Sequence, residues 1–202
     1  MIPFKKGIVI AFLGRSGSGK GTQANLLAKK FNLRIISTGN LARDFSKEKS
    51  MSGKLIAQIL EKGGFLPHWL ASFLWMREII QSQEPFLRIA FEGSPRKSGE
   101  ARDIDEVFNF YGLKNNIIAF YINISRQEAI KRLLARGRED DTKKAIENRL
   151  DEFEKFVIPV IEYYKKTKRL ITINGQQSVE DVFKEIVKKL KVKNDCSIRK
   201  RN

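Results

Sequence analysis

The fold is decided by one stretch of the sequence, Gly14-Arg15-Ser16-Gly17-Ser18-Gly19-Lys20-Gly21-Thr22. It follows the apolar run 8–13, which is typical of a strand buried on both faces, and leads into residues 21–31, whose apolar side chains recur at helical spacing. A glycine-rich loop between a strand and a helix is the setting of a phosphate-binding P-loop. Its glycines let backbone N–H groups turn inward, and the helix N-terminus favours an anion. The sequence therefore predicts a nucleoside triphosphate cradle, formed by Gly17, Ser18, Gly19, Lys20, Gly21 and Thr22.

Two side chains of this loop carry the predicted chemistry. Lys20 places a positive charge at the β and γ phosphates. The general motif has Ser or Thr directly after the lysine, whereas this chain has Gly21, so Thr22 has to supply the hydroxyl near Mg²⁺. Two other interpretations stay open. One is a dinucleotide-binding turn, although Thr22 stands at its last glycine position, and the other is a glycine-rich turn that binds nothing.

Strands and helices are predicted to alternate along the rest of the chain. Short apolar runs predict strands at 8–13, 34–37, 88–91, 116–124 and 170–173. Helical spacing predicts helices at 21–31, 38–47, 53–62, 67–80, 98–110, 127–136, 142–166 and 179–190, with a kink at Pro159. We therefore expect an α/β, P-loop NTPase-like fold, in which a five-stranded parallel sheet carries helices on both faces.

Composition excludes several classes of protein and site. The chain has 202 residues and no apolar run near the roughly 18 residues that a membrane-spanning helix needs, so we expect no membrane partner. Cys196 is the only cysteine and His68 the only histidine, which excludes an internal disulfide and a zinc site built on clustered cysteines. A reducing, cytoplasmic location is the expectation for such a chain. The net charge of +16 favours anionic partners such as nucleotides or nucleic acid.

Arginines stand near the ends of the predicted elements, or on helix faces that can line a cleft: Arg43, Arg96, Arg132, Arg136, Arg138 and Arg149. Any one of them alone is explained as well by a solvated surface charge. Transfer between two phosphate-bearing molecules, however, brings two polyanions together, and planar guanidinium groups offset their repulsion. An acceptor phosphate, whose second pKa is about 6, is largely ionised at neutral pH. Such a transfer therefore needs no general base, which suits a chain with one histidine.

Together these residues resemble the adenylate kinase and nucleoside monophosphate kinase family over about residues 7–185. The family's Lys-Gly-Thr-Gln run matches residues 20–23 and accounts for Gly21. Further segments resemble other motifs of the family: Ser37-Thr38-Gly39-Asn40-Leu41-Ala42-Arg43, Gly63-Gly64-Phe65-Leu66-Pro67, Glu92-Gly93-Ser94-Pro95-Arg96, Arg132-Leu133-Leu134-Ala135-Arg136 and Arg138-Glu139-Asp140-Asp141.

The resemblance implies a role for each matching residue. The acceptor nucleotide would contact Thr38, Arg43, Gly64, Phe65, Leu66, Gly93, Arg96, Glu100, Arg138 and Arg149. The donor, ATP, would contact the loop together with Arg132, Arg136 and Gln177. Mg²⁺ would lie near Thr22 and Glu92, held through water. The transfer itself would depend on Lys20, Arg96, Arg138 and Arg149.

The same resemblance implies an organisation. Residues 1–190 would form a single kinase domain, with a small helical acceptor-binding insert at about 38–67 and a minimal lid at about 137–141. This short-lid type lacks the family's zinc module, so no zinc is expected. Residues 191–202 would form a basic, flexible tail. We expect a monomer whose partners are small nucleotides.

Three residues depart from the family's pattern: Ser16 for proline, Glu92 for aspartate and Glu100 for the glutamine that reads the acceptor adenine. An ionised glutamate only accepts hydrogen bonds, whereas adenine presents both a donor and an acceptor. By resemblance Thr38 favours adenine, whereas this chemistry of Glu100 argues against it. AMP is the first acceptor to expect, and GMP, CMP or UMP is the alternative. A kinase of another small metabolite stays open, as does a non-catalytic, nucleotide-dependent RNA-binding protein suggested by the basic charge, although we do not expect nucleic acid to be a partner.

Overall fold

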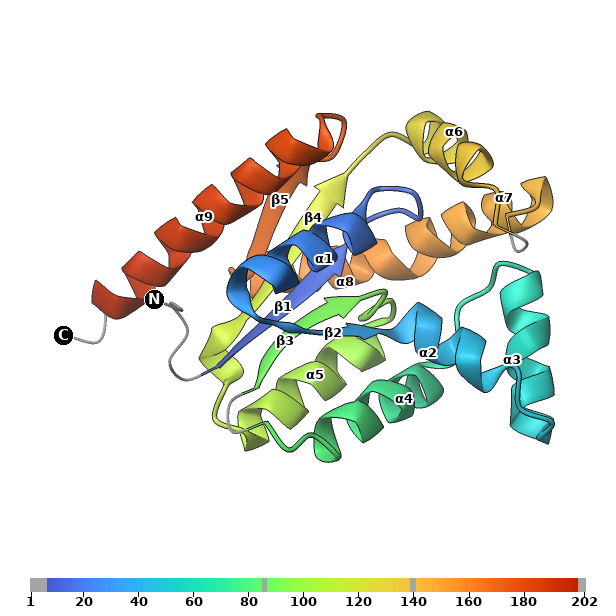
Figure 1. Ribbon diagram of the computed structural model, residues 1–202, viewed down its shortest axis with the longest axis horizontal. Coiled ribbons are helices and arrows are strands. Elements are labelled where there is room, and N and C mark those ends of the chain that lie inside the picture. Colours follow the sequence, from blue (N-terminus) through green and yellow to red (C-terminus); the bar gives the residue numbers. More distant parts are fainter. Residues whose placement is uncertain (1–6, 85–86, 139–140, 200–202) are drawn as a thin grey trace.

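The computed structural model describes residues 7–84, 87–138 and 141–199 (Figure 1). Its sheet is parallel and five-stranded in the order β2-β3-β1-β4-β5, which confirms the predicted fold class. The strands are β1 (Ile8–Leu13), β2 (Arg34–Ser37), β3 (Arg88–Glu92), β4 (Ile117–Asn123) and β5 (Leu170–Asn174). Every residue of β1 is buried, because this strand is central and both of its faces are covered.

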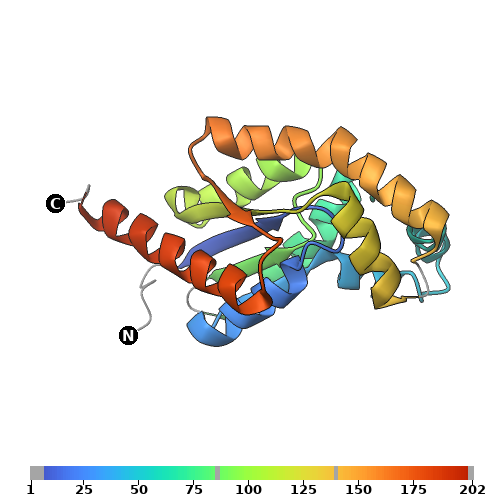
Figure 2. The same ribbon diagram turned by 90° about the horizontal axis from the view of Figure 1, so that it is seen from above.

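Helices cover both faces of the sheet (Figure 2). On one face, α1 (Lys20–Phe31) and α9 (Val179–Arg199) pack their apolar side chains against the strands, with Leu27 and Ile186 fully buried. On the other face lie α4 (His68–Ile80), α5 (Ser98–Phe110) and α8 (Ile158–Lys166). There the rings of Trp75 and Phe108 meet Phe91 of β3 edge to face. The two apolar layers fix the central strand and therefore the loop that follows it.

Four further helices lie beyond the carboxyl edge of the sheet (Figure 1). They are α2 (Thr38–Phe45), α3 (Met51–Glu61), α6 (Arg126–Arg136) and α7 (Lys143–Glu152). The first pair shares a small apolar cluster with α4, centred on Ile56 and Leu74, and the second pair shares another, centred on Leu133 and Leu150. Loops and helices of this edge are thus held by apolar clusters separate from the two that cover the sheet.

Two elements differ from their predicted form. The helix predicted at 142–166 is interrupted by a π-helical segment, Phe153–Val157, which ends two residues before Pro159. The missing N–H of this proline cannot continue the regular ladder. The helix predicted to end at residue 190 continues to Arg199. The predicted tail is therefore helical as far as residue 199, because this segment contains no Gly or Pro to stop a helix, while its flexibility stays a prediction. Residues 200–202 lie outside the described residues.

None of the described helices combines the length and the apolar character that crossing a bilayer requires. Residues 139 and 140 of the predicted lid lie outside the part of the chain that the structure describes.

Candidate active site

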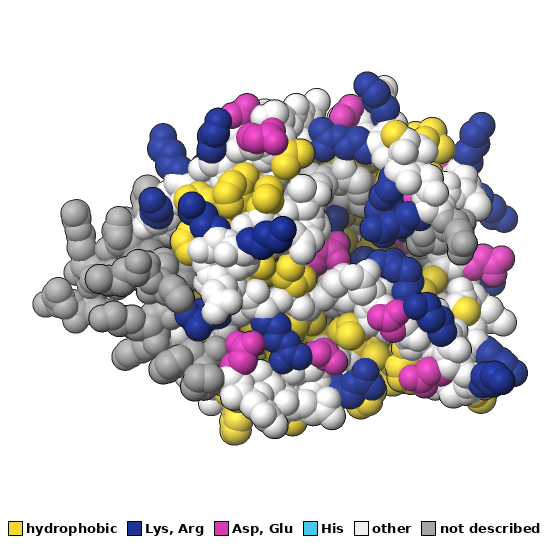
Figure 3. All heavy atoms as spheres, viewed as in Figure 1, with side chains coloured by type: hydrophobic (Ala, Val, Ile, Leu, Met, Phe, Trp, Pro, Cys, Tyr) yellow, Lys and Arg dark blue, Asp and Glu magenta, His cyan; other side chains and the backbone are white. Residues whose placement is uncertain are grey.

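A cavity of about 800 Å³ opens at the carboxyl edge of the sheet, next to the end of β1. Ligands of open α/β sheets bind at this edge, where the connections from a central strand leave in opposite directions. Most of the predicted site residues line it: Gly17, Gly19, Lys20, Gly21, Thr22, Arg43, Gly64, Glu92, Arg96, Arg132, Arg136, Arg138 and Arg149. Figure 3 shows one face of the molecule, and many Lys and Arg side chains lie on the half of it that holds the helices beyond the carboxyl edge of the sheet. The cavity is therefore built for a ligand with several negative charges.

The loop after β1 has the backbone of an anion cradle. Gly19 precedes α1 with a φ of 92°, and no side chain caps the first turn of that helix, so its N–H groups remain for a ligand. Gly14 has a φ of 145°, and a Cβ there would crowd the carbonyl oxygen of Ile122. Glycine is thus required where the chain leaves the strand.

Lys20 lies folded back over this loop. Its Nζ donates to the carbonyl oxygens of Gly14 and Arg15, each at 2.8 Å. The pKa of Lys20 is lowered to about 8, chiefly by burial and further by Arg96, Arg136 and Arg149, while Glu92 opposes the shift. An anion bound in the cavity would offset the repulsion from these arginines and favour the charged form of Lys20.

Glu92, the last residue of β3, is the carboxylate of the cavity floor. Its Oε2 accepts a hydrogen bond of 2.6 Å from Ser37 Oγ. Burial alone raises its pKa, but Lys20, the Ser37 hydroxyl and Arg96 together bring the pKa below its ordinary value. The group is therefore an anion at neutral pH and can balance a bound cation.

The residues around Glu92 fit a magnesium ion. Thr22 lines the same cavity, and a Cβ at Gly21 would lie 3.8 Å from Glu92 Cγ, so the loop and the carboxylate are neighbours. Among the described residues, no three His, Cys, Asp or Glu side chains gather as a ready-made metal cage. Mg²⁺ bound with phosphates needs none, because it takes most of its oxygen ligands from phosphate and water.

Arg96 and Arg43 line one side of the cavity. Arg96 Nε donates to Gly93 O at 2.7 Å, and its guanidinium carbon lies 4.4 Å from the centroid of the Phe65 ring. Burial lowers the pKa of Arg96, an effect opposed by Glu92 and Glu100. Arg43 Nη2 donates to the side-chain oxygen of Asn40. Both guanidinium groups line the large cavity, where they can bind an anion.

Asp141 organises the opposite side and was not among the predicted site residues. Its carboxylate, with only 1% of the side chain exposed, receives Arg136 at 2.7 Å and Arg149 at 2.9 Å. Burial tends to raise its pKa, yet the two arginines bring that pKa below the usual range. In the sequence, only its position next to the matched arginines pointed to Asp141, because its ion pairs form only where α6 and α7 meet.

Arg132 and Arg138 complete this side. Arg132 Nε donates to Glu128 Oε1 at 2.7 Å, and Arg132 Nη2 donates to Gly175 O at 3.1 Å. The latter bond joins α6 to the loop after β5. The backbone N–H of Arg138 donates to Asp141 Oδ2 at 3.4 Å.

Several predicted site residues are not brought to the large cavity: Ser18, Thr38, Phe65, Leu66, Gly93, Glu100 and Gln177. Phe65 and Gly93 instead line an adjoining space of about 20 Å³ behind Lys20. Ser18 and Leu66 are buried. Gln177 lies in the loop after β5, where its Nε2 donates to Asn174 O and Glu185 Oε2.

Glu100 and Thr38 are joined by Ser94, whose role the sequence did not reveal. Thr38 Oγ1 donates to Ser94 Oγ at 2.8 Å, and Ser94 Oγ donates to Glu100 Oε2 at 2.7 Å. Glu100 is 1% exposed and also accepts hydrogen bonds from the backbone at Arg96 and Lys97. It is the third residue of α5, so it reaches back to cap the helix, as a glutamate at this position commonly does.

Glu100 gives a pH-dependent stability that can be measured. Burial raises its pKa from 4.5 to about 7, against the Ser94 and backbone hydrogen bonds and the charge of Arg96. Its contribution to the free energy of unfolding is therefore full below pH 4.5 and lost as the pH rises through 7, a change of about 3 kcal/mol. We expect Glu100→Gln to abolish this change in urea unfolding between pH 4.5 and 8. Glu106→Gln, on the exposed side of α5, should leave it intact, and an equal pH dependence in both variants would contradict the assignment.

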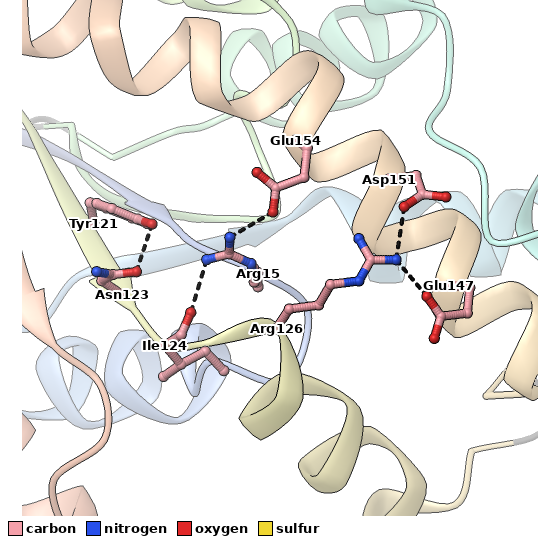
Figure 4. A network of polar contacts seen from close by, with 8 residues as sticks. All are labelled: Arg15, Tyr121, Asn123, Ile124, Arg126, Glu147, Asp151 and Glu154. Carbon is pink, nitrogen blue, oxygen red and sulfur yellow. Dashed lines mark hydrogen bonds and ion pairs between the residues drawn. The ribbon is translucent and has the colours of Figure 1, made fainter.

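Two arginine contacts brace the frame of the cavity (Figure 4). Arg15 of the loop donates to Ile124 O at 2.8 Å and pairs with Glu154 at 2.6 Å, while its guanidinium lies over the Phe153 ring. Arg126, the first residue of α6, pairs with Glu147 and Asp151 of α7. The loop is thus tied to the π-helical segment, and α6 is tied to α7.

Comparison with known proteins adds a family to this geometry. The family model described as adenylate kinase matches residues 12–169. An adenylate kinase of Azobacteroides pseudotrichonymphae is 34% identical, with 90% of this chain and 96% of that protein covered. Adenylate kinase 1 of a Nostoc species is 33% identical, covering 88% and 95%, and an adenylate kinase of Prochlorococcus marinus is 35% identical, covering 90% and 97%.

Proposed function

Because the chain belongs to the adenylate kinase family, and is therefore a phosphotransferase that acts on nucleoside monophosphates, we propose that it transfers the γ-phosphoryl group of ATP to AMP and releases two molecules of ADP. One observation carries the proposal. A single cavity holds the phosphate cradle with Lys20, the acceptor-side pair Arg43 and Arg96, and the pair Arg136 and Arg149. Two nucleotides that meet by their phosphates need this arrangement of positive charge.

The proposed transfer joins an oxygen of the acceptor phosphate to the γ-phosphorus while the bond to the bridging β–γ oxygen breaks. Charge spreads over the three equatorial oxygens of the moving group, and Lys20, Arg138 and Arg149 stabilise it. Arg96 and Arg43 hold the acceptor phosphate, and Arg132 and Arg136 hold the donor. No side chain needs to remove a proton, because the acceptor phosphate is already largely ionised.

Thr22 and Glu92 would hold Mg²⁺, mainly through water. When bound, the ion neutralises charge on the donor phosphates. The residues of the chain orient the two nucleotides around it and exclude water from the transfer.

AMP as the acceptor is supported by the names of the relatives and by Thr38, which matches the family's acceptor motif. Glu100 replaces the family's glutamine, which first argued for another base. Its burial and its hydrogen bonds with Ser94 and the start of α5 support a structural role for Glu100. In that role it would not disfavour adenine as the acceptor base. GMP, CMP and UMP remain the alternatives that the experiment has to test. The other two hypotheses, an RNA-binding protein and a kinase of a different metabolite, gain no support, while a monomeric state and a cytoplasmic location stay predictions.

A turnover screen tests the proposal. With MgATP as donor, we expect kcat/KM for AMP to exceed that for GMP, CMP and UMP by at least about fivefold, because one unmatched buried hydrogen bond costs about 1–3 kcal/mol. Glu100→Gln should keep this order. A shift toward AMP in the variant would return Glu100 to base recognition. Preference for another monophosphate would overturn AMP, and the absence of transfer to all four would overturn the proposed function.

A further inference from the structure

The loop between α3 and α4, residues 62–67, is fixed against α7. Asn148 Nδ2 donates to Lys62 O at 2.7 Å, and the Phe65 N–H donates to Glu152 Oε2 at 3.3 Å. Gly63 lies so close to α7 that a Cβ there would overlap the carbonyl oxygen of Ala145. The helix that holds this loop is also the one that carries Arg149 into the cavity.

This fixed loop places the Phe65 ring against one face of the Arg96 guanidinium. The ring centroid lies 4.4 Å from the guanidinium carbon, and only 8% of Phe65 is exposed. The Arg96 Nε donates to Gly93 O at 2.7 Å, and Gly93 leaves room for this approach, since a Cβ there would lie 3.2 Å from an Arg96 nitrogen. One contact therefore fixes the face of the guanidinium plane, and the other fixes one of its edges.

Such a support matters because Arg96 stands among like charges. Arg43 and Arg149 repel it, while Glu92 and Glu100 attract it toward the floor. An arginine side chain has several rotatable bonds and loses considerable freedom when it is held in one place. A buried aromatic ring opposes displacement by attraction to the cation, and it leaves the N–H groups in the guanidinium plane directed sideways, where they can grip a phosphate bidentately.

We propose that Phe65 is a positioning residue for phosphoryl transfer: its ring, held by α7, keeps the Arg96 guanidinium turned toward the phosphate of the acceptor nucleotide. This inference rests on the proposed function, since it gives Arg96 an acceptor phosphate to hold. Phe65 itself acts through Arg96. It thereby connects the acceptor side of the cavity to the helix that carries Arg149.

The test replaces Phe65 with Leu and with Met, which remain apolar but have no aromatic face, and with Tyr, which keeps one. We expect Leu and Met to raise the acceptor KM and the acceptor dissociation constant on the order of tenfold, with the ATP KM changed less than twofold. Tyr should restore wild-type values. In an Arg96→Met background, Phe65→Leu should have no further effect on acceptor binding, because the group that it positions is gone.

Phe156→Leu is the matched control. It makes the same substitution at a ring that Lys97 and Lys155 approach, outside both cavities. Thermal melting of every variant separates lost folding from lost positioning. The inference is overturned if Phe65→Leu leaves the acceptor KM unchanged, raises both KM values alike, or is not rescued by Tyr. The proposed function is overturned by a different result: the wild-type protein transfers phosphate to no nucleoside monophosphate, or it prefers one other than AMP. If it prefers another monophosphate, titration of that acceptor still tests Phe65.

Discussion

Replacing Lys20 with Met is expected to lower kcat with ATP and AMP by a factor of about 10²–10³, the usual cost of losing one preorganised charge contact in a transfer site. Methionine keeps much of the length and apolar bulk of the lysine chain but removes the Nζ that contacts the Gly14 and Arg15 carbonyls. Because Lys20 lies among Arg96, Arg136 and Arg149, its loss also relieves repulsion among these cations. The folded state should therefore survive. Initial rates of ADP formation and thermal melting measure the two effects separately.

Lys30→Met is the control, since it removes a lysine from the exposed last turn of the same helix. It should leave the rate within about twofold of the wild-type value, as expected for a surface substitution away from the site. Near-normal turnover by a correctly folded Lys20→Met protein would show that the loop is not the donor cradle.

Gly63→Ala is expected to destabilise the protein by about 2–4 kcal/mol. About 1–2 kcal/mol comes from the left-handed backbone, with a φ of +70°, and the rest from overlap of the new methyl group with the Ala145 carbonyl oxygen. The atoms that the methyl group would meet belong to the backbone of Ala145 in α7, so relief requires the loop to leave α7. Urea unfolding measures the loss as a lower midpoint.

Gly112→Ala separates the two causes. Gly112 has nearly the same φ, +69°, but nothing lies within 4 Å of the position that its Cβ would occupy. It should therefore lose only the part due to the backbone conformation. Equal losses at the two glycines would mean that the contact between residue 63 and α7 contributes nothing.

The framework of the fold could be read from the sequence because its signals are local. Each strand is a short apolar run, and the loop after β1 is marked by its glycines, so element type and order follow from neighbouring residues. The π-helical segment at Phe153–Val157 and the extension of α9 to Arg199 were not foreseen. The first depends on how the helix accommodates Pro159 while Glu154 pairs with Arg15. The extension of α9 depends on helix propensity, which the charge composition of the segment does not reveal.

The arginines that line the cavity were also predictable, because resemblance to the family marks each of them in the sequence. What holds those arginines was not. Asp141 meets Arg136 and Arg149 only after α6 and α7 pack, and Phe65 meets Arg96 only after residues 62–67 settle on α7. Glu100 is the reverse case: resemblance matches it to base recognition, while in the structure it is hydrogen-bonded to Ser94 and to the start of α5, so its role stays a prediction for the turnover screen. Pairwise partners of this kind are set by tertiary contacts rather than by spacing.

The shared carboxylate of Asp141 has a consequence for which solutes can occupy the protein. Arg136 and Arg149 already share one internal carboxylate, so a phosphate that binds them has to compete with Asp141. A small ion with one or two charges gains little from that exchange, whereas a triphosphate offers several oxygens at once and can recruit both arginines together. We therefore expect the site to discriminate against inorganic phosphate in favour of polyphosphates.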